Sequence, residues 1–514
     1  MSLRLIVGLL GMLLACIAAD INQKATSLAL ADIRGAFGFS ADQGSWLTTL
    51  YAAGVAMGML VAPWLAMTYS MRRFATGAVL SLGALGIVFT AIDSRELMLA
   101  LRWLQGLTNG FLIPLLMAMA LRFLTPPIKL FGLAAYGLTA TFAPNIASPV
   151  VIWADQGLGI DFVFWAVVPL CLLSAAMLLY GVPQDPRPPG RWRQFDWLGW
   201  ALGWGLCVSV VILFTQGERL DWFAAPLVRW LALAVATLAP LFVIRSCVAP
   251  VPLIRPQLLT RINFGFAVFM LVGVIALGAS AVSLPSEFLS QVQGYRPLQS
   301  LPVMLSLALP SLLMLPLTAF VLNFERVDAR WIMALGLILM AAASWHNSHV
   351  TLAWARDQLY LSQVMASTGM SMVVVSLLMT GTAVVDPQEG PFASATINTA
   401  RALAGPIASG VIGHALAVAV DGHQHTLLDR LGGVRFSLTQ SMSLGGHDGA
   451  ALAWPNAADG EAFHALYQQL TLQAQVLAFA DLWRALAVVA LLLLPVCLLP
   501  NRTFAPRFKR PKPL

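Results

Sequence analysis

The chain has 514 residues, of which 59% are hydrophobic and 10% are charged, and its formal net charge is +7. Soluble domains usually contain about 25% charged residues, so this chain has too few charges to cover a water-exposed surface. The composition therefore excludes an ordinary soluble protein and predicts an integral membrane protein. The positive charge does not indicate nucleic-acid binding, because most of it falls in short segments between apolar stretches.

Fourteen apolar stretches follow one another along the chain, most of them near the roughly 20 residues that cross a bilayer as an α-helix. All are expected to be helical, because lipid offers backbone groups no hydrogen-bond partner. The predicted fold class is therefore all-α, integral to the membrane. The predicted spans are 5–30, 42–65, 74–92, 96–120, 129–152, 160–182, 195–216, 224–246, 262–284, 298–322, 330–345, 353–380, 391–419 and 478–500.

The connecting segments divide these spans into groups of six, two and six. A Pro-rich, positively charged segment after the sixth span is typical of a linker. Each group of six is expected to form one bundle. The expected parts are an N-terminal six-helix bundle (1–183), a cytoplasmic linker with two inserted helices (184–250), a C-terminal six-helix bundle (251–500) and a basic cytoplasmic tail (501–514).

Lysines and arginines favour one side of the membrane. Most of them fall in alternate connecting segments and in the tail, including Arg72, Arg73 and Arg507–Lys512. The positive-inside rule then places both termini in the cytoplasm. The one long polar insertion, 420–477, becomes an external loop, whose final part, Glu461–Gln475, has helical periodicity. As an alternative, Leu13–Cys16 resembles a lipoprotein cleavage site, but cleavage there would destroy the first span and invert the charge pattern.

Charged side chains inside spans are costly in lipid, so each is a candidate functional residue. Asp20 and Lys24 are four residues apart on one helical face, where they can neutralise each other. Glu287 and Asp481 lie near span ends, where a headgroup-level position is the alternative. The charges are Asp20 and Lys24 in the first span, Arg102 in the fourth, Glu287 at the end of the ninth, Arg356 and Asp357 entering the twelfth, Arg401 in the thirteenth, and Asp481 and Arg484 entering the last.

Prolines interrupt corresponding helices in the two predicted bundles. Pro144 and Pro149 lie in the fifth span, and Gly405 and Pro406 lie in the thirteenth, which is the fifth of its bundle. Proline frees a backbone carbonyl and kinks a helix, which a membrane tolerates where protein or a cavity satisfies that carbonyl. Matching interruptions in two halves point to a central binding site. Packing kinks are the alternative interpretation, and the two are compatible.

Residues 101–110 read Leu-Arg-Trp-Leu-Gln-Gly-Leu-Thr-Asn-Gly. This R-x-x-Q-G pattern resembles the fourth helix of the major facilitator superfamily, where it is tied to proton coupling. Further stretches narrow the resemblance to the fourteen-helix drug:proton antiporters of the EmrB/QacA type, and the similarity runs over nearly the whole chain. These stretches are Gln43–Trp46, Phe195–Gly199, Gly217–Phe223 and Asn398–Gly405.

The resemblance implies a major facilitator fold in a bacterial inner membrane and alternating access around a central cavity. Proton binding at a buried carboxylate would be coupled to release of a substrate. Arg102 is the expected fixed charge, with Asp20, Glu287 or Asp481 as the proton carrier. The expected cavity residues, which could equally bind neighbouring helices, are Trp46, Gln105, Asn109, Asn145, Asn398 and Arg401. The expected gating or kink residues are Pro144, Pro149, Gly405, Pro406, Arg72 and Arg73.

Three departures from the family pattern bear on these roles. Residues 63–73 lack the acid of the usual loop motif, so gating by that loop does not carry over intact. Ser148–Trp153 keeps the proline of the antiporter motif but loses its glycines, which weakens the argument for export. Asn22 stands where the family usually has Asp, and Asp20 lies two residues earlier, about 200° around the helix.

The chain contains 16 Trp, 26 Phe and 20 Met, which suit a cavity for bulky lipophilic or aromatic molecules. Lipid-facing and interfacial positions explain many of them equally well. Proton-coupled uptake on the same fold is one alternative to export. A membrane enzyme acting on lipid-linked substrates is another, and it would need acids and histidines that only 420–477 could supply.

No catalytic residues, metal site or cofactor are expected. The histidines have no recognisable ligand spacing, and no phosphate-binding loop is present in the sequence. The expected partners are therefore small molecules, protons and the lipid bilayer. The resemblance also implies a periplasmic adaptor protein and an outer-membrane channel, for which 420–477 is the expected docking surface.

Overall fold

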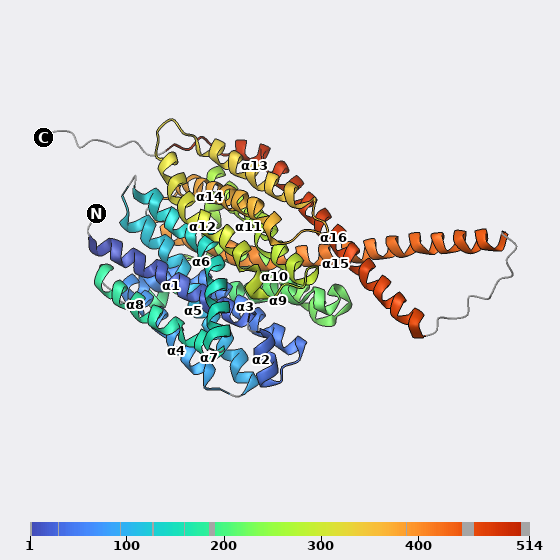
Figure 1. Cartoon of the computed structure of the whole chain (residues 1–514). Helices are drawn as coiled ribbons and strands as arrows, with labels where there is room; N and C mark the ends of the chain where they lie inside the picture. Colours follow the sequence, from blue (N-terminus) through green and yellow to red (C-terminus); the bar gives the residue numbers. More distant parts are fainter. Residues whose placement is uncertain are drawn as a thin grey trace.

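The computed structural model describes residues 3–28, 30–92, 94–125, 128–158, 160–184, 191–386, 388–444 and 457–504. Helices and connecting turns account for this part of the chain (Figure 1). The α-helices are α1 (Leu3–Leu28), α2 (Leu30–Phe37), α3 (Ala41–Tyr69), α4 (Met71–Thr90), α5 (Arg95–Phe123), α6 (Ile128–Leu158), α7 (Ile160–Trp165), α8 (Val167–Gly181), α9 (Trp197–Gln216), α10 (Pro226–Val248), α11 (Ile262–Gln291), α12 (Pro297–Leu322), α13 (Ala329–Asn347), α14 (Tyr360–Thr382), α15 (Gly390–Leu444) and α16 (Ala457–Leu492). The 3-10 turns are η1 (Arg191–Gln194), η2 (Glu218–Leu220), η3 (Trp222–Ala224), η4 (Pro256–Thr260), η5 (Arg356–Leu359) and η6 (Pro495–Leu498).

The helices confirm the predicted all-α membrane fold. Within the described ranges, 13 helices are long and apolar enough to cross a membrane. The predicted span 160–182 is divided at Ala166 into α7 and α8, and α8 is a shorter apolar helix. The division follows from Pro169, which has no N–H to donate to the carbonyl of Trp165. Each of the other predicted spans falls on one long helix.

The prediction of a loop at 420–477 is wrong for 420–444, which are helical, whereas α16 confirms the helical periodicity predicted for the final part of the segment. Helix α15 continues to Leu444 and α16 begins at Ala457, so both helices extend far beyond their predicted spans. Polar contacts hold the two extensions together: Gln424 Nε2 donates to Tyr467 Oη at 2.6 Å, and His423 Nε2 lies 2.8 Å from Asp481 Oδ2. A polar helix outside lipid has the composition of a loop, which explains the error.

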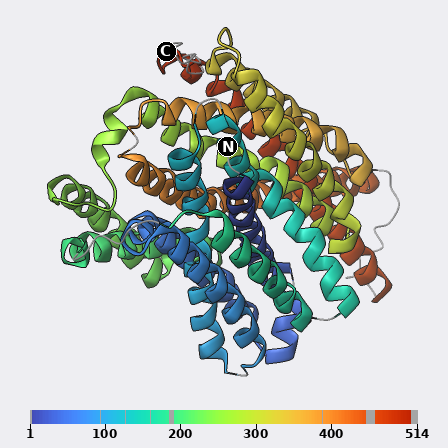
Figure 2. The ribbon, with the colours of Figure 1, turned by 90° about the vertical axis from the view of Figure 1, so that its left-hand side faces the viewer.

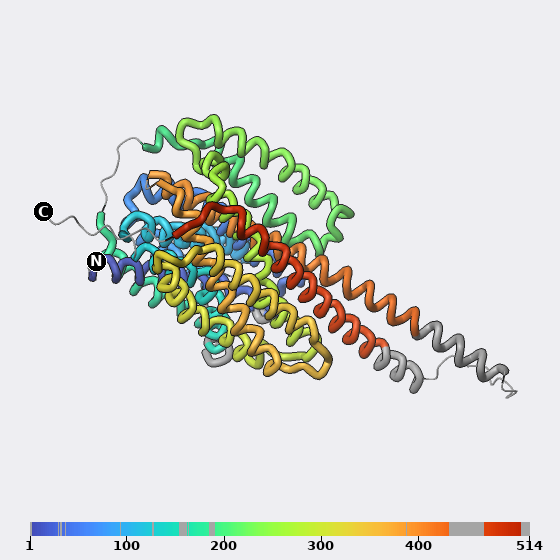
Figure 3. The backbone as a smooth tube through the Cα atoms, turned by 90° about the horizontal axis from the view of Figure 1, so that it is seen from above, coloured from blue at the N-terminus to red at the C-terminus, as the bar shows by residue number. Residues whose placement is uncertain are grey.

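The two ends of the molecule differ in the elements that they carry. The first turn of α1 and the last described residues lie at one end, here called the terminal end, and Figure 2 faces this end. Helices α15 and α16 project from the opposite end, here called the hairpin end (Figures 1 and 3). At the terminal end, the backbone N–H of Ala329 donates to the carbonyl of Thr503 at 3.3 Å, which ties the chain's end to α13.

Glycines allow α3 and α5 to pack with their backbones in contact. Gly54 and Gly58 on α3 face Gly106 and Gly110 on α5, and both pairs have the small-xxx-small spacing. A Cβ at Gly106 would collide with the backbone carbonyl oxygen of Tyr51. Since the obstacle is backbone rather than a flexible side chain, the two helices would have to separate. These glycines therefore fix the distance between α3 and α5.

The substitution Gly106→Ala is expected to destabilise the protein by roughly 1–3 kcal/mol, the usual cost of overpacking. The measurement is the midpoint of thermal unfolding of the purified protein in one detergent. Gly77→Ala on α4 is the matched control, because a Cβ at Gly77 meets no atom within 4 Å. Equal midpoints for the two variants would contradict the proposed role of the α3–α5 contact.

Helices α9 and α10 form a pair at the edge of the molecule, drawn in green in Figure 3. Helix α9 packs against α3, α10 and α15, whereas α10 contacts mainly α9. Apolar side chains of α10 face outward along its length, including Trp230, Leu233, Ile244 and Val248. Such a helix suits contact with lipid on most of its surface.

Candidate functional site

A cavity of about 350 Å³ lies among helices α1, α3, α5, α6, α11, α14 and α15, here called the central cavity. Three charged side chains line it: Asp20 and Lys24 from α1 and Arg401 from α15. The remaining wall is mainly apolar or weakly polar. It includes Val55, Met59, Ile113, Ile275, Val282 and Met370 together with Asn109, Asn145 and Ser283. A mainly apolar wall with a few fixed polar groups is typical of small-molecule sites.

A second cavity, of about 200 Å³, adjoins the central cavity. Lys24, Asn145, Val282 and Ser283 line both cavities. Helices α1 and α11 both start at the terminal end, so residues late in these helices lie toward the hairpin end. The second cavity is lined by one such residue, Glu287, near the end of α11. It therefore lies on the hairpin side of the central cavity.

Asp20 is the acid of the central cavity. Its side chain is buried, and the Oδ2 atom has no hydrogen-bond partner in the described part of the chain. The predicted neutralising pair with Lys24 is not formed: no ion pair between them lies within 4.0 Å, although both line the same cavity. An ionised carboxylate without a donor is costly in an apolar surrounding, and a proton on the oxygen removes that cost.

Arg401 joins α15 to α6 at the wall of the cavity. Its guanidinium donates to Thr139 Oγ1 at 2.9 Å and also to the carbonyl oxygen of Thr139. The guanidinium carbon lies 5.6 Å from the centre of the Tyr136 ring. The cation is therefore held by neutral groups, and its charge is not cancelled by an acid at these contacts.

Two further residues of α15 continue this connection toward the terminal end. Asn398 Oδ1 accepts a hydrogen bond from Tyr136 Oη at 2.8 Å, and Ser394 Oγ donates to the carbonyl of Pro114 at 3.0 Å. Positions 394, 398 and 401 are successive turns of one helical face. Together with Arg401 they form a polar ladder that binds α15 to α5 and α6. The ladder lies on the terminal side of the central cavity.

Arg102 is fully buried beside the central cavity and does not line it. Its Nη1 donates to Gln105 Oε1 at 2.6 Å and to Asn22 Oδ1 at 3.1 Å, and its guanidinium carbon lies 4.3 Å from the centre of the Tyr51 ring. Among described residues, no acid pairs with it. Tyr51 in turn accepts from Asn109 Nδ2 at 2.8 Å, and Asn109 lines the cavity. Arg102 is thus connected to the cavity through hydrogen-bonded neighbours.

The remaining predicted residues are distributed as follows. Asn145, Pro144, Gly405 and Pro406 line the central cavity, whereas Pro149, one turn beyond, does not. Glu287 lines the second cavity. Trp46 is half-buried near the start of α3. Gln105 and Asn398 are buried in contacts between helices. Asp481 is bound by His423 and Arg484 at the base of the hairpin. Arg72 and Arg73 open α4, where the side-chain amide of Gln184 lies 2.8 Å from Arg73.

Tyr51 and Tyr136 are absent from the predicted set, yet each contacts an arginine at or beside the cavity. Their hydroxyls bind Asn109 and Asn398. A sequence signal did exist, because a tyrosine in the middle of a membrane span needs a partner for its hydroxyl.

The Major Facilitator Superfamily sequence profile matches residues 12–409. A similar protein is the colistin resistance protein EmrB of Acinetobacter baumannii, 21% identical over 91% of this chain and 91% of its own length. The multidrug export protein EmrB of Escherichia coli is 22% identical over 59% of this chain and 61% of its own length. The puromycin resistance protein pur8 of Streptomyces alboniger is 26% identical over 78% of this chain and 79% of its own length.

Solved structures share the fold. The human organic anion transporter MFSD10 matches with a TM-score of 0.57 and 13% identity, over 97% of this chain and all of the other. The proton:xylose symporter XylE matches with a TM-score of 0.52 and 12% identity, over 95% of each chain. With the profile match and the helical fold, these findings show that the chain belongs to the Major Facilitator Superfamily and is a multi-pass membrane transporter of small molecules.

Proposed function

We propose that this chain is a proton-coupled exporter of lipophilic or aromatic small molecules. The observation that carries the proposal is Asp20, a carboxylate with an unpartnered oxygen in the wall of a largely apolar cavity. Drug-resistance proteins among its relatives support export as the direction. The cavity volume of about 350 Å³ suits a small lipophilic molecule, because ligand pockets are usually about 300–1,000 Å³.

In this mechanism, protonation of Asp20 changes the charge of the central cavity. Lys24 and Arg401 supply two positive charges, and ionised Asp20 supplies one negative charge. A proton on Asp20 removes that negative charge and the electrostatic attraction that the ionised carboxylate offers a substrate. Substrate and proton therefore occupy the cavity in alternation, which is the requirement for antiport.

Alternating access requires contacts that break as the cavity changes its opening. We propose that residues 1–183 and 251–500 form two bundles that rock against each other. The polar ladder of Ser394, Asn398 and Arg401 binds α15 of one bundle to α5 and α6 of the other. Its release would open the terminal end of the central cavity.

We propose a bacterial inner membrane as the location, with both termini in the cytoplasm, as the lysines and arginines indicate. The hairpin end is then periplasmic. The extensions of α15 and α16 project from that end (Figure 1), and they are the surface on which a periplasmic adaptor and an outer-membrane channel would dock.

The test is proton movement in inside-out vesicles that are energised to an acid interior. Addition of an exported drug is expected to dissipate the pH gradient, because each substrate that enters the vesicle releases protons from it. The panel contains lipophilic drugs, fatty acids and aromatic acids, and vesicles without the protein are the control. Dissipation only in right-side-out vesicles with an acid exterior would mean that substrate and protons enter together. That result would support uptake and contradict the proposed export.

A further inference from the structure

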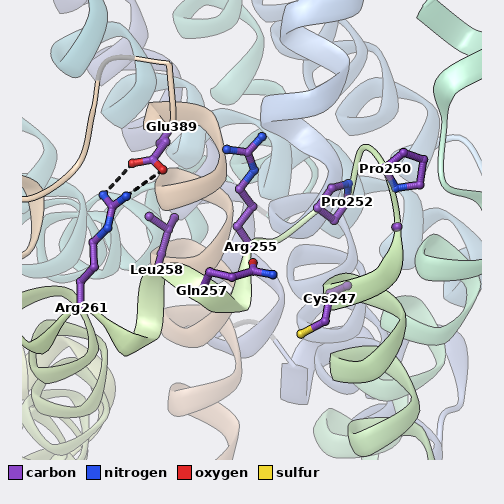
Figure 4. A pocket seen from close by; sticks show the side chains of 10 residues that line it. Cys247, Pro250, Pro252, Arg255, Gln257, Leu258, Arg261 and Glu389 are labelled. Atoms are coloured by element: carbon purple, nitrogen blue, oxygen red, sulfur yellow. Dashed lines mark hydrogen bonds and ion pairs between the residues drawn. The ribbon is translucent and has the colours of Figure 1, made fainter.

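A third cavity, of about 260 Å³, lies at the terminal end between the inserted helix pair and the following helices (Figure 4). The end of α10 contributes Cys247, the connection to α11 contributes Arg255 and Arg261, and the turn before α15 contributes Glu389. Pro250 and Pro252 form the turn beside it. We call it the connection cavity. It is separate from the central cavity and shares no lining residue with it.

Three arginines lie in or beside the connection cavity, and two of them form ion pairs. Arg245 binds Asp196 at 2.7 Å, and Arg261 forms two bonds with Glu389, at 2.7 and 2.9 Å. The Arg261 guanidinium holds the pKa of Glu389 below its usual range, so Glu389 stays ionised at neutral pH and keeps its ion pair with Arg261. In the described part of the chain, Arg255 forms no ion pair. Among the residues that line the cavity, Arg255 is therefore the cation without an ion-pair partner; Asp386, which lies outside the lining, also acts on Arg261.

The ring of Phe392 positions the Arg255 side chain. The guanidinium carbon lies 4.2 Å from the ring centre, within the range of a cation–π contact. Such stacking leaves the edge of the guanidinium, with its N–H donors, available to a ligand. Figure 4 shows Arg255 between Glu389 and the proline turn, within reach of the cavity. The arrangement suits a phosphate, which guanidinium groups bind through paired hydrogen bonds.

The apolar surface around the cavity places it at the edge of the membrane. Val248 ends α10 with 72% of its surface exposed, and Ile262 begins α11 with 59% exposed. Both side chains are expected to face lipid, and the polar cavity lies in the connection between them. This is the depth at which phospholipid headgroups meet the protein.

We propose that the connection cavity binds the phosphate of an anionic phospholipid through Arg255. The lipid tail would lie along the exposed apolar surface of α10 and α11. Because the cavity is formed by the end of α10, the connection to α11 and Glu389 just before α15, a bound lipid would join the inserted pair to the C-terminal bundle.

Cys247 provides a reporter inside the cavity. It is exposed, whereas Cys16, Cys171, Cys207 and Cys497 are buried. The full-length protein would be placed in nanodiscs of phosphatidylcholine alone or with phosphatidylglycerol, and alkylation of Cys247 by uncharged N-ethylmaleimide would be followed by peptide mass spectrometry. Phosphatidylglycerol is expected to slow the reaction about fivefold, the effect of one basic side chain at an anionic surface.

Arg255→Gln is expected to remove this protection, and Arg255→Lys, which keeps the charge, should retain part of it. Arg296→Gln at the hairpin end is the matched control and should behave like the unmodified chain. Equal protection in Arg255→Gln, or no protection in the unmodified chain, would overturn the proposal. Protection by inorganic phosphate in phosphatidylcholine nanodiscs would also overturn it, because the site would then bind free phosphate.

Discussion

Replacement of Asp20 by asparagine is expected to reduce proton-driven transport to background while substrate exchange continues. Asparagine has nearly the same shape as aspartate, so the central cavity should keep its form, but the amide cannot carry a proton. The measurement compares two assays in proteoliposomes: substrate-dependent loss of a pH gradient, and exchange of labelled substrate across the membrane without a gradient. If the substrate-dependent loss of the pH gradient disappears while substrate exchange continues, Asp20 is needed for proton coupling and not for folding.

Three other substitutions make the assignment to Asp20 specific. Asp357→Asn is the control, because Asp357 lies exposed at the hairpin end with 73% of its side chain accessible. Glu287→Gln and Asp481→Asn test the other two candidate carriers. Glu287 lines the second cavity, and the Asp481 carboxylate is already bound by two basic side chains. Proton-driven transport that survives in Asp20→Asn but disappears in Glu287→Gln would move the proton site to the second cavity.

The sequence could predict the fold because membrane helices obey a simple rule of length and apolar composition. Two features escaped that rule. Pro169 divides the sixth span, an effect of one missing N–H that hydrophobicity does not record. The extension of α15 is a polar helix outside the predicted span, and polarity alone does not distinguish a helix from a loop, whereas the helical periodicity late in 420–477 did indicate the extension of α16.

The candidate site could be predicted in part because charged side chains are rare in membrane-spanning helices. Asp20 and Arg401 were singled out on that basis, and the structure brings them to one cavity from helices at opposite ends of the sequence. Their hydrogen-bond partners could not be predicted, since a partner such as Thr139 is an unremarkable residue until α15 packs against α6. Arg102 was expected at the proton carrier, yet it lies behind the cavity wall. The difference changes its expected role from a charge that acts on the carrier to a residue that positions it.

Arg102→Ala is expected to abolish proton-driven transport through loss of this positioning. Arg102 binds Asn22, which lies two residues after Asp20 on α1, and it binds Gln105 on its own helix. Without the guanidinium, the two side-chain oxygens are buried with no donor, at a cost of about 1–3 kcal/mol for each group. The segment of α1 that carries Asn22 and Asp20 would then shift from its position. Proton-driven transport should therefore fall further than substrate exchange does.

Arg102→Lys separates charge from geometry. Lysine keeps the positive charge, but its ammonium lacks the planar fork that reaches Asn22 and Gln105 together and stacks on the Tyr51 ring. If Arg102 positions α1, the lysine variant should be nearly as defective as the alanine variant in proton-driven transport, and its pH profile should differ from that of the unmodified chain. Full activity in Arg102→Lys would show that the charge alone suffices. Full activity in Arg102→Ala would exclude Arg102 from coupling, because no other described residue replaces its bond to Asn22.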